Sequence, residues 1–406
     1  MPPLWRNRSY MLLWSGQTIS SLGSSISGIV FPLLILALTH SPTAAGIAGA
    51  LGTIPYLIFS LPVGALIDRW DRKLVMMLCD AGRAISLASV PVALAFNALT
   101  IWQLYINAFV EGTLFVFFNI AEVASLGRVV DKQQLPAAAA QNEAAGNISI
   151  LIGPQLGTII YQSLGRAIPF VFDAVSYVVS VISLSFIKIP FQDERVAADR
   201  HLREEIREGV AWLWHQPLVR FMAFLTGGLN FVNSAIFLVV IVVAKNFGAS
   251  DASIGTIFTI GAIGGIGGAL IGGRIQRRFR FGQVIIATVW VDVLLVPLYA
   301  VAPHVLVLGL ITAFFFLVGP IYNVVQFSYR ISIIPDALQG RVNSSFRLLA
   351  FGFQPLGSFI AGVLLDNVGT GLTIAFFSVC LLVIGLLTAF NRPLREAAPI
   401  HGQAAA

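Results

Sequence analysis

Roughly a dozen stretches of about 20 mostly apolar residues run through this chain, separated by short polar breaks. A helix of about 20 such residues crosses the hydrocarbon core of a bilayer. The composition agrees, because 57% of the residues are hydrophobic and only 11% are charged, too few to cover a surface exposed to water. The sequence therefore predicts an all-α membrane protein with twelve transmembrane helices. The predicted spans cover residues 11–38, 44–67, 74–97, 101–126, 137–164, 168–188, 218–244, 253–273, 281–302, 305–330, 341–365 and 371–390.

Basic residues are distributed unevenly over the loops that join these spans. Nearly all of the 25 Lys and Arg residues fall in one set of alternate loops, whereas the opposite set holds only Arg166 and Lys245. Cationic loops stay in the cytoplasm during membrane insertion. We therefore expect a multi-pass protein of the cell (inner or plasma) membrane with both termini in the cytoplasm. The same placement accounts for the net charge of +6 without nucleic-acid binding.

Short sequence matches indicate an internal duplication. The Gly-Ala-Leu-Ile segment at 64–67 recurs at 268–271, and a basic cluster follows each copy. Transporters commonly use such repeats to build a central site between two halves. The sequence therefore predicts two pseudo-symmetric six-helix bundles, residues 1–189 and residues 218–406, the second ending in a cytoplasmic tail.

The longest polar break, residues 190–217, is predicted to be a cytoplasmic linker. Its second part has helical periodicity, with Leu202, Ile206, Val210 and Leu213 on one face and charged residues on the other. We expect this part to form an amphipathic helix that lies at the membrane interface.

The loop after the second span contains the most specific motif in the chain. Gly64 is followed by Asp68-Arg69 and then, after two residues, by Arg72-Lys73. This pattern resembles the signature loop of the major facilitator superfamily and matches it at each of these positions. Glycine permits close approach of a helix, and aspartate can meet the positive end of another helix. The resemblance implies a latch on the cytoplasmic side, formed by Gly64, Asp68, Arg69, Arg72 and, at the start of the eleventh span, Arg341.

A second motif lies in the fifth span, where Gly153-Pro154 is followed by Gly157 and Thr158. It resembles the antiporter motif of drug-exporting members of this superfamily, with Thr158 in place of the final glycine. Proline kinks a membrane helix, and small residues allow close packing of helices. Small residues also recur along the eighth span, at Gly261, Gly265, Ala269 and Gly272. We expect them to offer the fifth span a surface for close packing.

Further segments narrow the resemblance to one branch of the superfamily. Trp5-Arg6-Asn7-Arg8 and the Gly340-Arg341-Val342-Asn343 segment that opens the eleventh span are similar to the macrolide-efflux and enterobactin-exporter group. The resemblance covers nearly all of the chain up to its C-terminal tail. It implies the major facilitator fold, alternating access and drug–proton antiport. One departure is that the first span has no acidic residue, where several drug exporters carry one.

Charged residues inside predicted spans are costly in a bilayer, so they are candidate functional groups. Glu111 lies near the middle of the fourth span, and Glu122 follows on the same helical face, about 16 Å further along the helix. A low dielectric disfavours the charged form of a carboxyl group, which suits the loading and release of a proton. An alternative is that Glu122 only pairs with an interfacial arginine, Arg128 or Arg330. The residues predicted to couple transport to protons are Glu111, Glu122, Asp80 and Arg83.

Other charges in the spans have structural explanations. Asp80 and Arg83 are three residues apart and can pair along the third span, which would support the adjacent latch. Asp173 and Asp292 rank below Glu111 as proton carriers, because the resemblance places their spans at the periphery of the fold.

A mild polar stripe is expected to line a central cavity, which the resemblance places between spans one, four, seven and ten. For any one serine or asparagine, a simple hydrogen bond between helices remains the alternative. Aromatic and amide groups with few charges suit a bulky amphipathic ligand. The predicted cavity residues are Gln17, Ser20, Ser24, Phe115, Asn119, Asn230, Asn233, Tyr322 and Gln326.

We predict a proton-coupled secondary exporter of amphipathic small molecules such as drugs or antibiotics, powered by the proton gradient and without a cofactor. The expected partners are the substrate, protons and membrane lipids, and the expected state is a monomer. No metal site is expected, because no two of the five histidines have metal-ligand spacing. A siderophore exporter, a lipid or lysolipid flippase and an uptake permease of the same fold remain alternatives. A membrane enzyme is disfavoured, because no nucleophile has a base at productive spacing.

Overall fold

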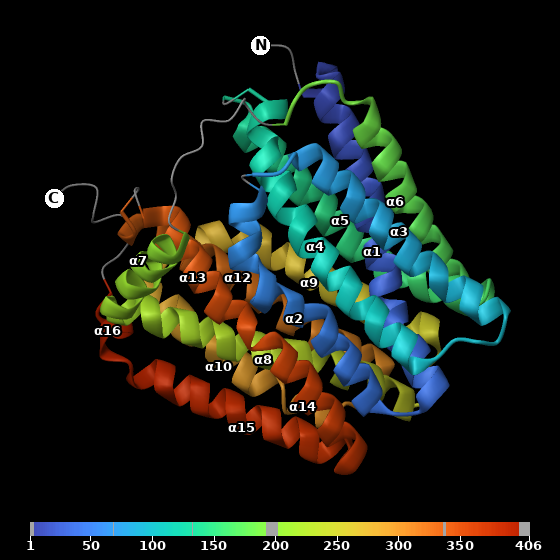
Figure 1. The fold of residues 1–406 in the computed structure, drawn as a ribbon. Helices are drawn as coiled ribbons and strands as arrows, with labels where there is room; N and C mark the ends of the chain where they lie inside the picture. Colours follow the sequence, from blue (N-terminus) through green and yellow to red (C-terminus); the bar gives the residue numbers. More distant parts are fainter. Residues whose placement is uncertain (1–3, 68, 132, 192–201, 336–337, 398–406) are drawn as a thin grey trace. The chain divides into compact units, whose positions relative to one another are not determined.

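The computed structural model describes residues 4–67, 69–131, 133–191, 202–335 and 338–397. These residues are almost all helical and contain no β-strand, which confirms the all-α prediction (Figure 1). Within the described ranges, 11 helices are long and apolar enough to cross a membrane. The predicted fifth span also forms a helix, α5 (Leu135–Ser163), of 29 residues, but it is not among these 11. Its first half carries Gln141, Asn142, Glu143 and Asn147, which lower its hydropathy.

The helices follow one another with short connections. The N-terminal half of the chain contains α1 (Arg8–Thr39), α2 (Pro42–Ile67), α3 (Arg72–Ala95), α4 (Ile101–Val129), α5 and α6 (Ile168–Phe186). The remaining helices are α7 (Leu202–His215), α8 (Pro217–Asn246), α9 (Asp251–Arg278), α10 (Phe281–Leu295), α11 (Leu298–Val301), α12 (Val305–Ile333), α13 (Gln339–Gly352), α14 (Gln354–Asn367), α15 (Gly369–Phe390) and α16 (Arg392–Arg395), and a 3-10 helix, η1 (Leu4–Arg6), precedes α1.

The chain divides into two compact units. The N-terminal unit contains Met1–His40 and Leu51–Arg200, and the C-terminal unit contains Ser41–Ala50 and His201–Ala406. The first turns of α2 therefore group with the C-terminal unit, where the Ser41 hydroxyl donates to Asp366 at 2.5 Å. Part of the predicted linker, residues 190–217, lies outside the described residues, and its described helix α7 groups with the C-terminal unit.

In the N-terminal unit, α1 packs beside α5 and α6, and α3 packs beside α4 and α6 (Figure 1). α3 shows why polar groups end up inside this unit. Leu74, Leu78 and Ile85 form an exposed apolar stripe on one side of the helix, which suits contact with lipid. The opposite, buried side carries Asp80 and Arg83. The apolar stripe thus directs two charged residues of a membrane helix towards its neighbours.

In the C-terminal unit, glycines bring α9 and α12 into close contact. A methyl group at Gly264 would overlap the carbonyl oxygen of Ala313, and one at Gly268 would overlap that of Leu317. The tightest contacts are therefore one residue away from the predicted Gly265 and Ala269. An added Cβ at Gly261 would lie 2.9 Å from a methyl carbon of Thr312, so Gly261 also packs closely against α12. The small residues of the eighth span thus serve packing against α12 within their own unit.

Two predicted spans are interrupted by breaks at proline. The eleventh span divides into α13 and α14 at Phe353, and Pro355 lies in the first turn of α14. The ninth span divides into α10 and α11, with Pro297 as the residue that caps α11. Proline removes a backbone donor and clashes with the preceding turn, so a membrane helix bends or restarts there.

The predicted amphipathic helix forms as α7. Leu213 is buried, whereas Val210 is 42% exposed. The neighbouring Gly209 is buried instead, and its backbone lies against the backbone of Arg341 in α13. α7 therefore approaches α13 through Gly209 and leaves Val210 exposed.

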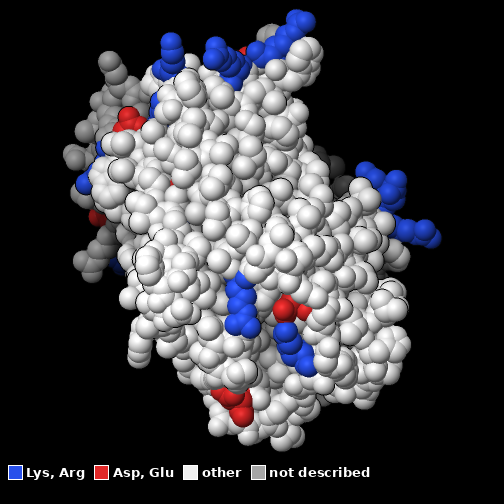
Figure 2. Space-filling view, turned by 90° about the vertical axis from the view of Figure 1, so that its right-hand side faces the viewer, with Lys and Arg blue, Asp and Glu red and all other residues white. Residues whose placement is uncertain are grey.

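Large apolar side chains also cover much of the outer surface. On α15 the exposed residues include Leu372, Val379, Leu387 and Phe390. A broad part of the face in Figure 2 carries no charged residue, and many of its Lys and Arg residues lie near the edges of the view. Apolar surface of this extent suits a bilayer.

Substituting Gly264 tests the close α9–α12 contact. We expect Gly264→Ala to destabilise the protein by about 1–3 kcal/mol, because the added methyl group overpacks a helix contact. Gly273→Ala on the same helix is the matched control, since an added Cβ there meets no atom within 4 Å. Thermal unfolding in detergent should show a lower midpoint for Gly264→Ala only, and equal midpoints would contradict the contact.

Candidate functional site

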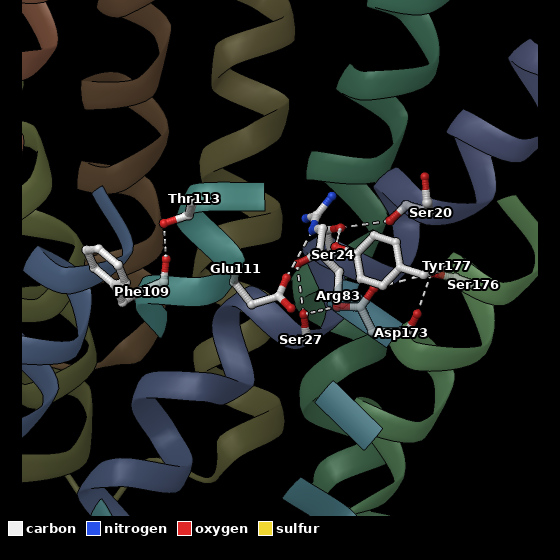
Figure 3. Close-up of polar contacts among 10 residues, drawn as sticks. All are labelled: Ser20, Ser24, Ser27, Arg83, Phe109, Glu111, Thr113, Asp173, Ser176 and Tyr177. Atoms are coloured by element: carbon white, nitrogen blue, oxygen red, sulfur yellow. Dashed lines mark hydrogen bonds and ion pairs between the residues drawn. The ribbon is translucent and has the colours of Figure 1, made fainter. Parts of the chain in front are cut away.

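A group of charged and hydroxyl side chains is buried where α1, α3, α4 and α6 of the N-terminal unit meet (Figure 3). α3 contributes Asp80 and Arg83, and α4 contributes Glu111. α6 contributes Asp173 and Tyr177, and α1 adds serine hydroxyls. We call these five residues of α3, α4 and α6 the polar cluster.

Arg83 makes the principal contacts of the polar cluster. Its Nε donates to Oε2 of Glu111 at 3.1 Å, which is also an ion pair. Its guanidinium carbon lies 4.2 Å from the ring centroid of Tyr177 and 5.8 Å from that of Phe115. A guanidinium group over an aromatic face gains cation–π attraction. Because the Arg83 side chain is only 10% exposed, these contacts take the place of water around its charge.

The ion pair differs from the one expected from the sequence. Asp80 and Arg83 are predicted to pair along α3, but the long Arg83 side chain reaches across to Glu111 of α4 instead. Asp80 is fully buried and lies close to Ser180 of α6. No described donor makes a hydrogen bond of good geometry to either of its carboxyl oxygens. Asp80 therefore contributes a buried carboxyl group that forms no ion pair with a described residue.

Asp173 belongs to the polar cluster, although the sequence ranks it below Glu111. Asp173 is only 1% exposed. The Ser27 hydroxyl donates to its Oδ2, and the Ser176 hydroxyl donates to its Oδ1 at 3.2 Å. α1 and α6 approach closely here, because a methyl group at Gly23 would overlap Ser176 and lie 2.6 Å from Asp173. The glycine thus allows the Asp173 carboxyl to meet α1.

Tyr177 extends the hydrogen bonding to the first helix. Its hydroxyl shares a 2.7 Å hydrogen bond with the hydroxyl of Ser24, which in turn donates to the carbonyl of Ser20 at 2.8 Å (Figure 3). No role for Tyr177 is predicted from the sequence. The available signal was helical spacing, because Asp173, Tyr177 and Ser180 fall on one face of a largely apolar helix.

The charges of the polar cluster do not balance if every group is ionised. Three carboxyl groups, on Asp80, Glu111 and Asp173, share one guanidinium group. Each buried ion costs several kcal/mol to remove from water unless it is paired. Arg83 offsets one carboxylate, so the net charge of the cluster changes with the number of protons that the other carboxyls hold. This arrangement is chemically suited to taking up and releasing protons.

A cavity of about 530 Å³ borders the polar cluster. Its walls come from α1, α3, α4 and α5, and its volume is within the range of about 300–1,000 Å³ that suits drug-sized ligands. Arg83 belongs both to the cluster and to the cavity wall, whereas Glu111 is not among the described residues that line it. Every cavity residue predicted for the N-terminal half lines this cavity, namely Gln17, Ser20, Ser24, Phe115 and Asn119.

Glu111 and Glu122 have different surroundings, although both lie on α4. Glu111 binds Arg83, whereas Glu122 lines the cavity. No hydrogen bond or ion pair joins the Glu122 side chain to another described residue, so the alternative pairing with Arg128 is not seen. Glu143 of α5 is a further carboxyl group in the cavity wall.

The cavity residues predicted for the second half lie in the C-terminal unit and have varied surroundings. Asn230 donates to the backbone of Ala350 at 2.8 Å, which is the structural alternative considered for such residues. The Tyr322 hydroxyl shares a 2.7 Å hydrogen bond with Thr226. Gln326 is buried, and Asn233 is exposed.

The chain matches a known protein family over most of its length. Residues 13–353 match the model of the Major Facilitator Superfamily. The chain belongs to the Major Facilitator Superfamily. It is thus a multi-pass membrane protein whose family members are transporters, as the motifs predict.

Several curated relatives of this superfamily member are exporters by name. The multidrug efflux pump Tap of Mycolicibacterium fortuitum is 26% identical, over 95% of this chain and 96% of that protein. The enterobactin exporter EntS of Escherichia coli O81 is 24% identical, over 93% of this chain and 90% of that protein. Macrolide efflux protein A of Streptococcus pyogenes is 26% identical over 52% of each chain. The predicted resemblance to the macrolide-efflux and enterobactin-exporter group is confirmed.

Solved structures of transporters share the fold. The nucleoside transporter NupG matches with a TM-score of 0.77 and 12% identity, over 95% of this chain and 100% of that chain. A bacterial homologue of the iron transporter ferroportin, in an inward-facing state, matches with a TM-score of 0.74 and 14% identity, over 95% and 98%. The major facilitator fold is therefore established for this chain.

The residues of the superfamily's signature loop have several partners. Arg72 donates to the backbone carbonyls of Ala124 at 2.7 Å and Phe191 at 3.5 Å, which ties the loop to α4 and to the segment after α6. Arg69 is exposed, and an added Cβ at Gly64 would meet nothing of its own unit within 4 Å. Arg341 forms an ion pair with Glu208 of α7. Asp68 lies outside the described residues, so its latch contact remains a prediction.

The antiporter-like motif of this superfamily member packs α5 against α1. A methyl group at Gly153 would overlap Ser25, and one at Gly157 would lie 2.5 Å from the carbonyl of Ile26. Pro154 lies between the two glycines and its carbonyl accepts a hydrogen bond from Thr158 at 2.9 Å. The motif therefore holds α5 against the part of α1 whose serines, Ser24 and Ser27, hydrogen-bond to the polar cluster.

Removing Arg83 tests whether its charge holds the polar cluster together. We expect Arg83→Met to cost about 3–5 kcal/mol of stability, because it leaves buried carboxyl groups without a counter-charge. Glu111→Gln should cost less, since Arg83 still lies in the field of Asp80 and Asp173. Differential scanning fluorimetry of the purified protein gives the unfolding midpoints.

The double variant Arg83→Met/Glu111→Gln is the internal control for this experiment. It should lose less stability than the sum of the two single losses, because removing both partners leaves fewer uncompensated charges. Strictly additive losses, or an Arg83→Met protein as stable as the wild type, would mean that the ion pair does not organise the cluster.

Proposed function

We propose that this chain is a proton-coupled secondary exporter of amphipathic small molecules and works by alternating access. Two curated relatives that align with more than nine-tenths of this chain are named as a multidrug efflux pump and an enterobactin exporter. Their names support outward transport. The transporter uses the proton gradient and no cofactor. It lies in the cell's inner or plasma membrane as a monomer, with both termini in the cytoplasm, and binds the substrate, protons and lipids.

The observation that carries the proton coupling is the buried Arg83–Glu111 ion pair. A proton that binds to Oε2 of Glu111 converts the carboxylate to a neutral acid and cancels the attraction to the Arg83 guanidinium. Arg83 then turns to the other carboxyl groups of the polar cluster, whose field it already feels. Release of the proton restores the original pair.

Arg83 also provides the link between proton and substrate. It is the one member of the polar cluster among the described residues that line the cavity. A change of partner by Arg83 therefore changes the cavity wall, and a ligand in the cavity changes the preference of Arg83 between its partners. By linkage, each ligand affects the binding of the other to the same extent. Such reciprocity is what exchange of a proton for a substrate requires.

A siderophore exporter is the second candidate, because the enterobactin exporter aligns with 93% of this chain. Such a substrate is itself a large, partly aromatic molecule, so the proposed coupling by Arg83 and Glu111 would apply to it as well. The two candidates differ in the charge that the cavity must accept.

The proton coupling is tested with Glu111→Gln in proteoliposomes under an imposed pH gradient. We expect the variant to bind substrate, but its gradient-driven flux should fall at least about tenfold, because glutamine cannot carry a proton. The probes are a macrolide, a tetracycline and a catecholate siderophore, added one at a time. If adding a probe collapses the pH gradient, protons are being exchanged for that probe, and the probe identifies the substrate class.

Glu396→Gln is the matched control for this measurement, since Glu396 forms an exposed ion pair with Arg392 on α16. The control should transport like the wild type. If Glu111→Gln still concentrates the probe as the wild type does, Glu111 is not the proton carrier. If no probe collapses the gradient in the wild type, the result favours the hypothesis of a lipid flippase or an uncoupled permease.

The latch is tested by comparing two aspartates of the signature loop. Asp68→Asn should impair transport several-fold without loss of folded protein, because it removes the charge that the resemblance assigns to the latch. Asp71→Asn is the control, since Asp71 caps α3 by accepting from the Leu74 N–H at 2.9 Å, and asparagine caps a helix equally well. Normal turnover in Asp68→Asn, measured beside the control, would remove the latch.

A further inference from the structure

The charges around the 530 Å³ cavity are unevenly compensated. Three charged side chains are among the described residues that line it, namely Arg83, Glu122 and Glu143. The Arg83 guanidinium is already occupied by Glu111 at 3.1 Å and by the ring of Tyr177 at 4.2 Å. Glu122 makes no hydrogen bond or ion pair with a described residue. The carboxyl group of Glu122 is therefore available to a ligand, whereas the cation of the cavity wall is engaged.

The surroundings of Arg83 reinforce this imbalance. Asp80 and Asp173 act on the same guanidinium group as Glu111 does. An anionic ligand that approached Arg83 would compete with these carboxyl groups and would also face Glu122 and Glu143. A cationic ligand meets the opposite situation, because every uncompensated group of the wall is acidic. Electrostatic complementarity therefore favours a positive charge in the cavity.

The rest of the wall suits an aromatic or apolar body attached to that charge. Phe115 is 46% exposed, and Phe118 lines the same cavity from the neighbouring turns of α4. Val123 and Leu126 add apolar surface on the same helix. Aromatic faces attract cations and also bury apolar groups. Phe115 and Glu122 are seven residues apart, about two helical turns, so both lie on one side of α4.

We propose that this cavity selects amphipathic cations, with the Glu122 carboxylate as the counter-charge of a protonated amine or similar group and with Phe115 and Phe118 against its aromatic or apolar body. Glu122 and Glu111 then have separate tasks. Glu122 binds the substrate charge in the cavity, and Glu111 carries the proton behind the wall. The division of roles between Glu111 and Glu122 rests on the proposed export function. The recognition of a cation does not, because it is a property of the cavity itself.

A pair of probes of nearly equal size and opposite charge tests this selectivity. Tetraphenylphosphonium and tetraphenylborate differ mainly in the sign of their charge, and both carry four aromatic rings. Equilibrium binding of each, measured separately to the full chain in lipid nanodiscs, gives a cation-to-anion preference. Empty nanodiscs correct for partition into lipid. We expect the wild type to bind the cation at least about tenfold more tightly, the effect of one well-formed charge contact.

Glu122→Gln keeps the size of the side chain and removes its charge. It should weaken tetraphenylphosphonium binding by about tenfold or more, whereas Glu122→Asp should keep most of the affinity, because it keeps the carboxylate. Glu396→Gln again serves as the control and should bind like the wild type. Phe115→Leu should weaken cation binding by about threefold to tenfold, because it removes an aromatic face but no charge.

The outcomes separate this inference from the proposed function. Unchanged tetraphenylphosphonium affinity in Glu122→Gln, or a wild-type preference for tetraphenylborate, would overturn the inference, and the second result would favour an anionic substrate such as a siderophore. Proton flux that depends on Glu111 could stand in either case. Conversely, cation binding through Glu122 without any proton flux would support this inference and refute proton coupling. If Glu122→Gln does not fold, the wild-type preference and the Glu122→Asp affinity decide the question.

Discussion

The cost of burying the Arg83 guanidinium inside a membrane helix bundle is the constraint around which the N-terminal unit is arranged. A single charge in an apolar medium must find partners, since the bilayer offers no water in their place. Glu111 supplies the opposite charge at 3.1 Å, and the ring of Tyr177 covers the guanidinium face at 4.2 Å. These partners come from α4 and α6, so the charge of one residue fixes how three helices pack. The same partners make the pair sensitive to a proton, because the attraction depends on the charge of one carboxyl group.

Small residues make this arrangement sterically possible. Gly23 lets α6 approach α1 until Asp173 can accept from Ser27, and Gly153 and Gly157 bring α5 against the same part of α1. In the C-terminal unit, Gly264 and Gly268 perform the corresponding packing between α9 and α12. In a bilayer, helices gain little from excluding lipid, and close backbone contact is one of the main sources of association. The motif that resembles an antiporter signature is therefore also a packing motif.

The cavity and the polar cluster are adjacent but chemically distinct. Glu122 lines the cavity and makes no hydrogen bond or ion pair with a described residue, whereas Glu111 pairs with Arg83 behind the wall. Arg83 belongs to both the cluster and the cavity wall. A transporter that must exchange two ligands needs sites that influence each other without being identical. In the proposed exchange of a proton for a substrate, Arg83 would link the two sites, because it belongs both to the ion pair with Glu111 and to the cavity wall.

The sequence by itself determined the membrane class, the helical spans and the superfamily. The length of each apolar stretch and the spacing of the motif from Gly64 to Lys73 can both be recognised from consecutive residues, without the tertiary structure. Gln17, Ser20, Ser24, Phe115 and Asn119 line the cavity of the N-terminal unit. They are predicted from the family resemblance, which names the cavity-lining spans, together with helical periodicity, which decides which side chains share a face. Only the tertiary structure decided that Arg83 pairs with Glu111 rather than with Asp80, and that Asp173 is buried in the polar cluster. Partner choice between helices depends on their rotation and on close approach at residues such as Gly23, and no spacing along one helix contains that information.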